Sequence, residues 1–88
     1  MDNPSEFAMC IAEESGLRYS VGKMCGVIIY GSTGNAVELD YFNGSNGHIL
    51  FYYLSNYDES VIDFCDEYNL ADPKSIDDIM GWISKLKA

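Results

Sequence analysis

The sequence predicts an α+β fold: a three-stranded antiparallel meander with one N-terminal and two C-terminal helices, in the order α-β-β-β-α-α. Three observations predict this class. A helix start stands at residues 3–6, apolar segments separated by turns rich in Gly and Asn fill residues 17–54, and apolar residues at helical spacing follow from residue 55. With 88 residues, the chain is expected to form a single domain over residues 1–88.

The N-terminal helix is predicted from its ends. Asn3 can cap the helix, and Pro4 suits the first helical position because its missing N–H is not needed there. Gly16 can take the left-handed conformation that commonly ends a helix. Between these ends runs an apolar stripe made of Phe7, Cys10 and Ile11.

The central part of the chain predicts the sheet. Three segments have strand character: Met24–Tyr30, Ala36–Phe42 and His48–Leu54. Short turns separate them, so they are expected to be antiparallel neighbours, and Leu17–Val21 can begin a further strand. A simple meander makes Ala36–Phe42 central, whereas apolar residues on both faces favour the other two segments as central strands. The strand order therefore stays open.

The C-terminal third predicts two helices. The first begins at Ser55 or Asn56 and ends near Asn69, and its apolar stripe at i, i+3, i+4 and i+7 consists of Val61, Phe64, Cys65 and Tyr68. Asp72 and Pro73 begin the second, as cap and first residue. Its predicted buried face consists of Ile76, Ile79, Met80, Ile83 and Leu86.

Acidic residues concentrate in the same third of the chain. Eight of the 14 carboxylates lie between Asp58 and Asp78, and Lys74 is the only cation among them. In a helix, Glu59, Asp63, Asp66 and Glu67 would share the side opposite the apolar stripe. Such a row of carboxylates can stand in for phosphates and occupy a nucleic-acid-binding groove, while a merely solvated helix face is the alternative. The candidate partner-binding residues are Asp58, Glu59, Asp63, Asp66, Glu67, Asp77 and Asp78.

The net charge of −9 restricts the partners. It repels nucleic acid and anionic membranes, so a basic protein surface is the expected partner, although the charge can also serve solubility alone. The polar, acidic N-terminus lacks the apolar stretch of a secretory signal, which predicts a cytoplasmic protein. Its three cysteines are then expected to be buried thiols, with a single disulfide as the alternative.

Aromatic residues offer a second candidate surface. If helices cover one face of the sheet only, Phe42 and Tyr52 are left partly exposed, and an exposed Tyr-rich face is typical of protein interfaces. This interpretation predicts an adaptor or oligomerisation module, with a homodimer as one form. The alternative places a helix layer on each face. Trp82, at the edge of its helix's apolar stripe, is a further candidate contact or a half-buried rim residue.

The sequence carries no motif for catalysis. Its single histidine, His48, follows a turn, and no spacing pairs it with a cysteine as a nucleophilic dyad. The scattered cysteines lack the paired spacing of a metal site. We therefore expect neither a metal, nor a cofactor, nor an enzyme.

In size, acidity and element order the chain resembles small phage-encoded anti-CRISPR proteins that mimic nucleic acid. The resemblance covers the whole chain in outline, and it includes a strand running straight into an acidic helix over His48–Tyr68. It implies an α+β inhibitor that binds the DNA-reading site of a CRISPR effector. Because it rests on layout and charge, it assigns no role to an individual residue.

Overall fold

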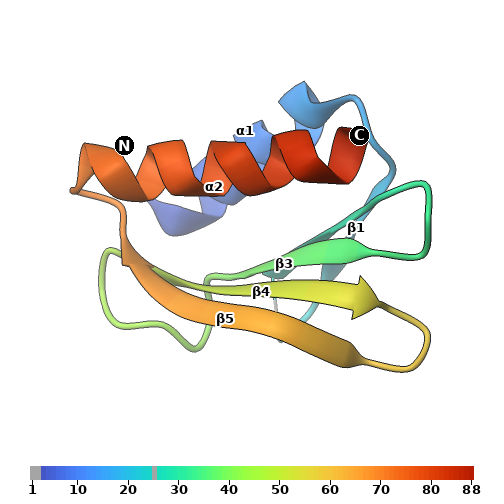
Figure 1. The fold of residues 1–88 in the computed structure, drawn as a ribbon. Coiled ribbons are helices and arrows are strands. Elements are labelled where there is room, and N and C mark those ends of the chain that lie inside the picture. Colours follow the sequence, from blue (N-terminus) through green and yellow to red (C-terminus); the bar gives the residue numbers. More distant parts are fainter. Residues whose placement is uncertain (1–2, 25) are drawn as a thin grey trace.

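The computed structural model describes residues 3–24 and 26–88 and has α+β architecture. Two helices, α1 (Pro4–Ser15) and α2 (Pro73–Lys87), pack on a five-stranded antiparallel sheet of order β1-β2-β3-β4-β5. The strands are β1 (Tyr19–Gly22), β2 (Gly26–Tyr30), β3 (Ala36–Asp40), β4 (His48–Asn56) and β5 (Val61–Asn69). Both helices lie on the same face of the sheet (Figure 1).

The prediction of three strands is therefore wrong in number, while the α+β class and the three central strands are confirmed. Residues 19–22 form β1, which pairs with β2 in antiparallel register, so the strand that the segment 17–21 could begin does exist. The meander order places β3 at the centre of the sheet, which settles the order that the sequence left open.

The larger correction concerns residues 61–69, which form strand β5 in place of the predicted acidic helix. Val, Ile, Phe and Tyr favour strands, and carboxylates at i, i+4 would repel one another in a helix. The nine residues of β4 offer a pairing partner of equal length, and Ser60 adopts a positive φ of 55° in the connecting turn. Both periodicities fit Phe64 and Tyr68, and pairing with β4 selects the strand.

The two helices begin as their capping residues predict. The side chain of Asn3 accepts hydrogen bonds from the backbone N–H groups of Ser5 and Glu6, and Gly16 ends α1 with a φ of 73°. Asp72 Oδ1 accepts a bond of 3.0 Å from the backbone N–H of Lys74 at the start of α2. These bonds satisfy backbone donors that a helix leaves free in its first turn.

The core lies between the helices and one face of the sheet. Alternate strand residues point toward the helices because side chains of a strand alternate between its faces. The register aligns them in rows across the sheet, such as Val27–Leu39–Phe51 and Ile29–Val37–Tyr53. From the helices, Phe7, Ala8, Ile11, Ala12, Ile79, Ile83 and Leu86 complete this core.

No helix in the described part of the chain covers the opposite face of the sheet (Figure 1). The alternative with a helix layer on each face is thus wrong, because α1 and α2 contribute to one core. Ile28, Ala36 and Leu54 point to this open face and are nevertheless buried, since neighbouring side chains on a twisted sheet cover one another.

Asp40 fixes the loop between β3 and β4. It is 4% exposed, and its Oδ1 accepts hydrogen bonds from the backbone N–H groups of Phe42 and Asn43, at 2.9 and 3.1 Å. Its Oδ2 accepts a third bond from Asn43 Nδ2 at 2.9 Å. A buried carboxylate is tolerated here because donors surround it.

Replacing Asp40 by Ala is expected to lower the free energy of unfolding by about 1–3 kcal/mol, because three donors lose their acceptor. Urea denaturation measures this loss. Asp58→Ala, at an exposed carboxylate in the β4–β5 turn, is the control and should stay within about 0.5 kcal/mol of wild type. Equal stability of the two variants would show that Asp40 does not organise the loop.

Candidate protein-binding surface

The predicted acidic residues lie on strand β5, on helix α2 and in the turn that precedes β5. Asp58 and Glu59 lie in the β4–β5 turn, while Asp63, Asp66 and Glu67 lie on β5. Asp77 and Asp78 lie on α2. Because residues 61–69 form a strand, the predicted single helical face of four carboxylates does not exist.

On a strand these carboxylates divide between its two sides. Asp66 pairs with Phe51 and so faces the helix side, whereas Glu67 pairs with Leu50 and faces the open side. Asp63 lies at a register shift, where Phe64 pairs with Tyr53 and Ile62 with Leu54. The negative charge therefore follows the edge of the sheet on both sides, and does not form a flat row.

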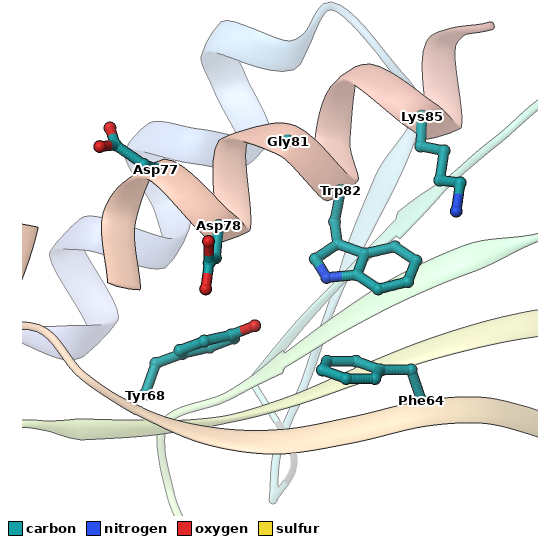
Figure 2. A pocket seen from close by; sticks show the side chains of 7 residues that line it. All are labelled: Phe64, Tyr68, Asp77, Asp78, Gly81, Trp82 and Lys85. Atoms are coloured by element: carbon teal, nitrogen blue, oxygen red, sulfur yellow. The ribbon is translucent and has the colours of Figure 1, made fainter. Parts of the chain in front are cut away.

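A cleft separates the β5 edge from α2 (Figure 2). Its volume is about 490 Å³, and the residues that line it are Phe64, Tyr68, Asp77, Asp78, Gly81, Trp82 and Lys85. The side chains of Phe64 and Tyr68 rise from the strand toward the helix, and Trp82 reaches down from the helix between them and Lys85. Asp78 points toward Tyr68, while Asp77 points away.

Trp82 forms the wall of this cleft and also packs against the core. Its ring stacks on Phe64 with centroids 5.0 Å apart and an interplanar angle of 27°, and it lies 4.8 Å from the ring of Tyr53. Lys85 Nζ lies 4.7 Å from the Trp82 ring centroid, within cation–π range. The expected half-buried position of Trp82 is confirmed, but its neighbours make it part of an aromatic cluster.

The cleft has a negative electrostatic character. Burial raises the pKa of the Tyr68 phenol, and the nearby carboxylates of Asp78 and Asp66 raise it further, while a hydrogen bond with Trp82 opposes them. Removing a proton from Tyr68 would add negative charge beside these two carboxylates. The same environment favours a cation that enters from outside.

Gly81 leaves one wall of the cleft open. Glycine inside a helix costs roughly 0.8–1 kcal/mol relative to alanine. A Cβ added to Gly81 would meet no atom within 4 Å, so packing in this chain does not require glycine there. The sequence signal that could have found this site is a glycine between Met80 and Trp82, inside an otherwise regular amphipathic helix.

Glu67 forms a hydrogen bond with His48, the single histidine of the chain. Glu67 Oε2 lies 2.9 Å from Nδ1 of His48, and this hydrogen bond lowers the pKa of the Glu67 carboxyl, with a smaller contribution from Ser45. His48 is therefore paired with a carboxylate on the neighbouring strand. Among the acidic residues on β5, Glu67 is the one that pairs with His48.

The open face carries a second candidate surface. A row of side chains crosses it from Ser20 through Ile28, Glu38 and Tyr52 to Cys65. Tyr52 is half-buried and lines a hollow of about 240 Å³ with Glu38, Leu54 and Ile62. Phe42 is 51% exposed, as predicted, but it lies in the β3–β4 loop against Tyr41.

Burial of Glu38 between apolar neighbours raises the pKa of its carboxyl, and the carboxylate of Asp40 raises it further. Its cross-strand neighbours Ile28 and Tyr52 offer no cation. The open face thus holds a carboxylate whose ionised form is disfavoured in the free protein.

The cysteines differ from expectation. Cys10 and Cys65 are free thiols and both are exposed, so the predicted burial is wrong for these two, and Cys25 lies outside the described residues. On α1 the core side is taken by Ala8 and Ala12 with Phe7 and Ile11, which turns Cys10 outward. On β5, the strand geometry places Cys65 on the open face.

Other classes of site find no support in the described residues. No group of three or more His, Cys, Asp or Glu side chains there could hold a metal ion. None of the helices in that part of the chain is long and apolar enough to cross a membrane. No family model, no curated protein and no solved structure matches this chain.

Glu38→Gln is expected to raise the free energy of unfolding at pH 7, because it removes a desolvated charge beside Asp40. The folded-state pKa of Glu38 lies above its unfolded value. The destabilisation is thus complete above the folded-state pKa and vanishes below the unfolded one. The gain should therefore shrink as the pH falls through this window, which urea denaturation at several pH values measures.

Glu14→Gln, at an exposed carboxylate on α1, is the matched control and should change stability little at any pH. A Glu38→Gln variant no more stable than wild type at pH 7 would contradict the desolvation of Glu38.

Proposed function

We propose that this chain is a non-catalytic cytoplasmic domain that binds a basic protein surface through its β5–α2 side. The observation that carries the proposal is the cleft, where Asp78 of α2 lies beside the aromatic side chains of Phe64, Tyr68 and Trp82. Asp66 of β5 is also close enough to Tyr68 to raise the pKa of its phenol. An aromatic centre with a charged rim is the usual anatomy of a protein interface. A role in solubility alone would explain the negative charge, but it does not explain an open aromatic cleft on the same side of the molecule.

The charge selects the class of partner. A net charge of −9 attracts a basic surface over distances of a Debye length, about 8–10 Å at physiological salt. Proteins that handle nucleic acid carry such surfaces, because they bind phosphates with Lys and Arg. CRISPR effectors, nucleases and DNA-binding regulators are the candidate partners. Binding would exclude nucleic acid from the surface by charge and by bulk, with no chemical step.

Charge reversal on β5 tests the proposal. Asp63→Lys with Asp66→Lys changes the net charge from −9 by +4 to −5 and places cations on β5, the strand that carries Phe64 and Tyr68. Binding of a basic partner should weaken at least about tenfold at low salt, because opposed charges become like charges. The measurement is capture from a lysate of the organism that carries the gene, with stepwise salt elution and added DNA as competitor.

Glu13→Lys with Glu14→Lys is the matched control, since it changes the net charge equally on α1. The control should retain the partner. Loss of the partner in both variants would show that binding depends on net charge and not on the β5–α2 side. Retention of the partner in both variants would rule out the β5–α2 side as the interface.

A second candidate function rests on the open sheet face. We propose that, in this alternative, an adaptor module presents Tyr52 and Ile62 to an apolar partner surface with a cation opposite Glu38. A homodimer through this face would bring Glu38 and Asp40 of two copies together, which opposes self-association.

Tyr52→Ala distinguishes the two functions. It should weaken partner capture about tenfold or more if the open face is the interface, because Tyr side chains at interface centres carry much of the binding energy. Under the β5–α2 proposal, capture should be unchanged. Sedimentation at rising protein concentration reports whether the partner is a second copy.

A further inference from the structure

We propose that β5 accepts an extended segment of the basic partner as a sixth strand, and that a Lys or Arg side chain of this segment enters the cleft beside α2. This inference rests on the proposed function and names how the partner is held. It combines a free sheet edge, an aromatic cleft along that edge and a helix glycine that leaves the cleft open.

The edge is available for pairing. β5 is the last strand of the sheet, nine residues long, and within the described residues it pairs with β4 alone. An edge strand presents backbone N–H and C=O groups that another strand can bind. One of these donors is occupied: the backbone N–H of Glu67 donates to Asp66 Oδ1 at 2.8 Å. A carbonyl of the added strand can replace that acceptor.

The cleft lies where the added strand would direct alternate side chains. Phe64 and Tyr68 face the helix side of β5, two residues apart from Asp66, and they line the cleft with Trp82 (Figure 2). A strand beside β5 has the same alternation, so every second side chain points toward α2. The remaining side chains would lie on the open side, next to Ile62, which is 52% exposed.

The chemistry of the cleft selects a basic side chain. A Lys or Arg stem can lie on the aromatic rings while its cation meets the carboxylate of Asp78. Lys85 already stands over the Trp82 ring, so the ligand cation is expected on the Tyr68 side of the cleft. An acidic side chain would be repelled there by Asp66 and Asp78.

A second copy of this chain is a poorer occupant. In an antiparallel pairing of two β5 strands centred on Cys65, Asp63 of one copy would lie opposite Glu67 of the other. Like charges directly opposite each other destabilise a sheet. The same carboxylates favour a strand with Lys or Arg at the facing positions, so charge complementarity identifies the partner as a basic extended segment.

The test uses the full chain and a displayed library of random nine-residue peptides, the length of β5. We expect selected peptides to place Lys or Arg at alternate positions. Trp82 is the only tryptophan and it lines the cleft, so its fluorescence should change as such a peptide binds. N-methylation of alternate peptide amides should abolish binding, because it removes the donors that pair with β5.

Gly81 supplies matched variants that do not disturb the core, since its Cβ position is unoccupied. Gly81→Gln and Gly81→Ala should both raise the melting temperature, because both residues favour helices. Gly81→Gln should raise the Kd of the selected peptide about tenfold by filling the mouth of the cleft, whereas Gly81→Ala should change it less than about threefold.

Three outcomes would overturn strand addition: no peptide is selected, N-methylation leaves binding intact, or Gly81→Gln binds as well as wild type. The failure of the proposed function is distinguishable from these. Suppose that capture of a basic protein depends on Asp63 and Asp66 but is unchanged by Gly81→Gln. The β5–α2 side would then remain the proposed interface, and strand addition would be rejected.

Discussion

Pairing of β5 with β4 is the interaction on which the rest of the structure depends. It converts a segment with helical spacing into a nine-residue strand, and it brings Phe64 and Tyr68 over Phe51, with ring centroids 6.1 and 5.6 Å away. Trp82 completes this aromatic cluster from α2. Without the pairing, the cleft would lack one wall, the sheet would end at β4, and the carboxylates of residues 63–67 would lie elsewhere.

The placement of both helices on one face of the sheet leaves the opposite face without a helix layer among the described residues. A sheet of this size needs only one covered face to form a core, and the opposite face can remain in contact with solvent. Here the uncovered face is not simply polar, because Ile28, Leu54 and Glu38 are buried or half-buried among neighbouring strands. The raised pKa of Glu38 follows from that position, so a partner's cation placed against the open face would relieve an unfavourable charge there.

The two edges of the sheet are protected differently. β1 is four residues long and carries no acidic residue, whereas β5 is nine residues long and carries three. Charged residues on a long edge discourage pairing with copies of the same chain. The same charges attract a strand of opposite sign, so protection against self-association and selection of a basic partner are two effects of one arrangement. Gly81, at the mouth of the cleft, leaves room for a side chain to enter. Protection of the edge against self-association would not require this space.

The sequence by itself determined the elements with strong local signals. The caps of α1 and α2, the three central strands and the acidic C-terminal third could be predicted from Asn3, Asp72, the Gly- and Asn-rich turns and the charge count. Local signals were ambiguous at residues 61–69, where Phe64 and Tyr68 satisfy both a helical and a strand period. Only the tertiary structure decided that segment, because the backbone hydrogen bonds that select the strand come from β4. The cleft depended on that decision too, because Phe64 stacks on Trp82 only when β5 joins the sheet and α2 packs on the face to which Phe64 points.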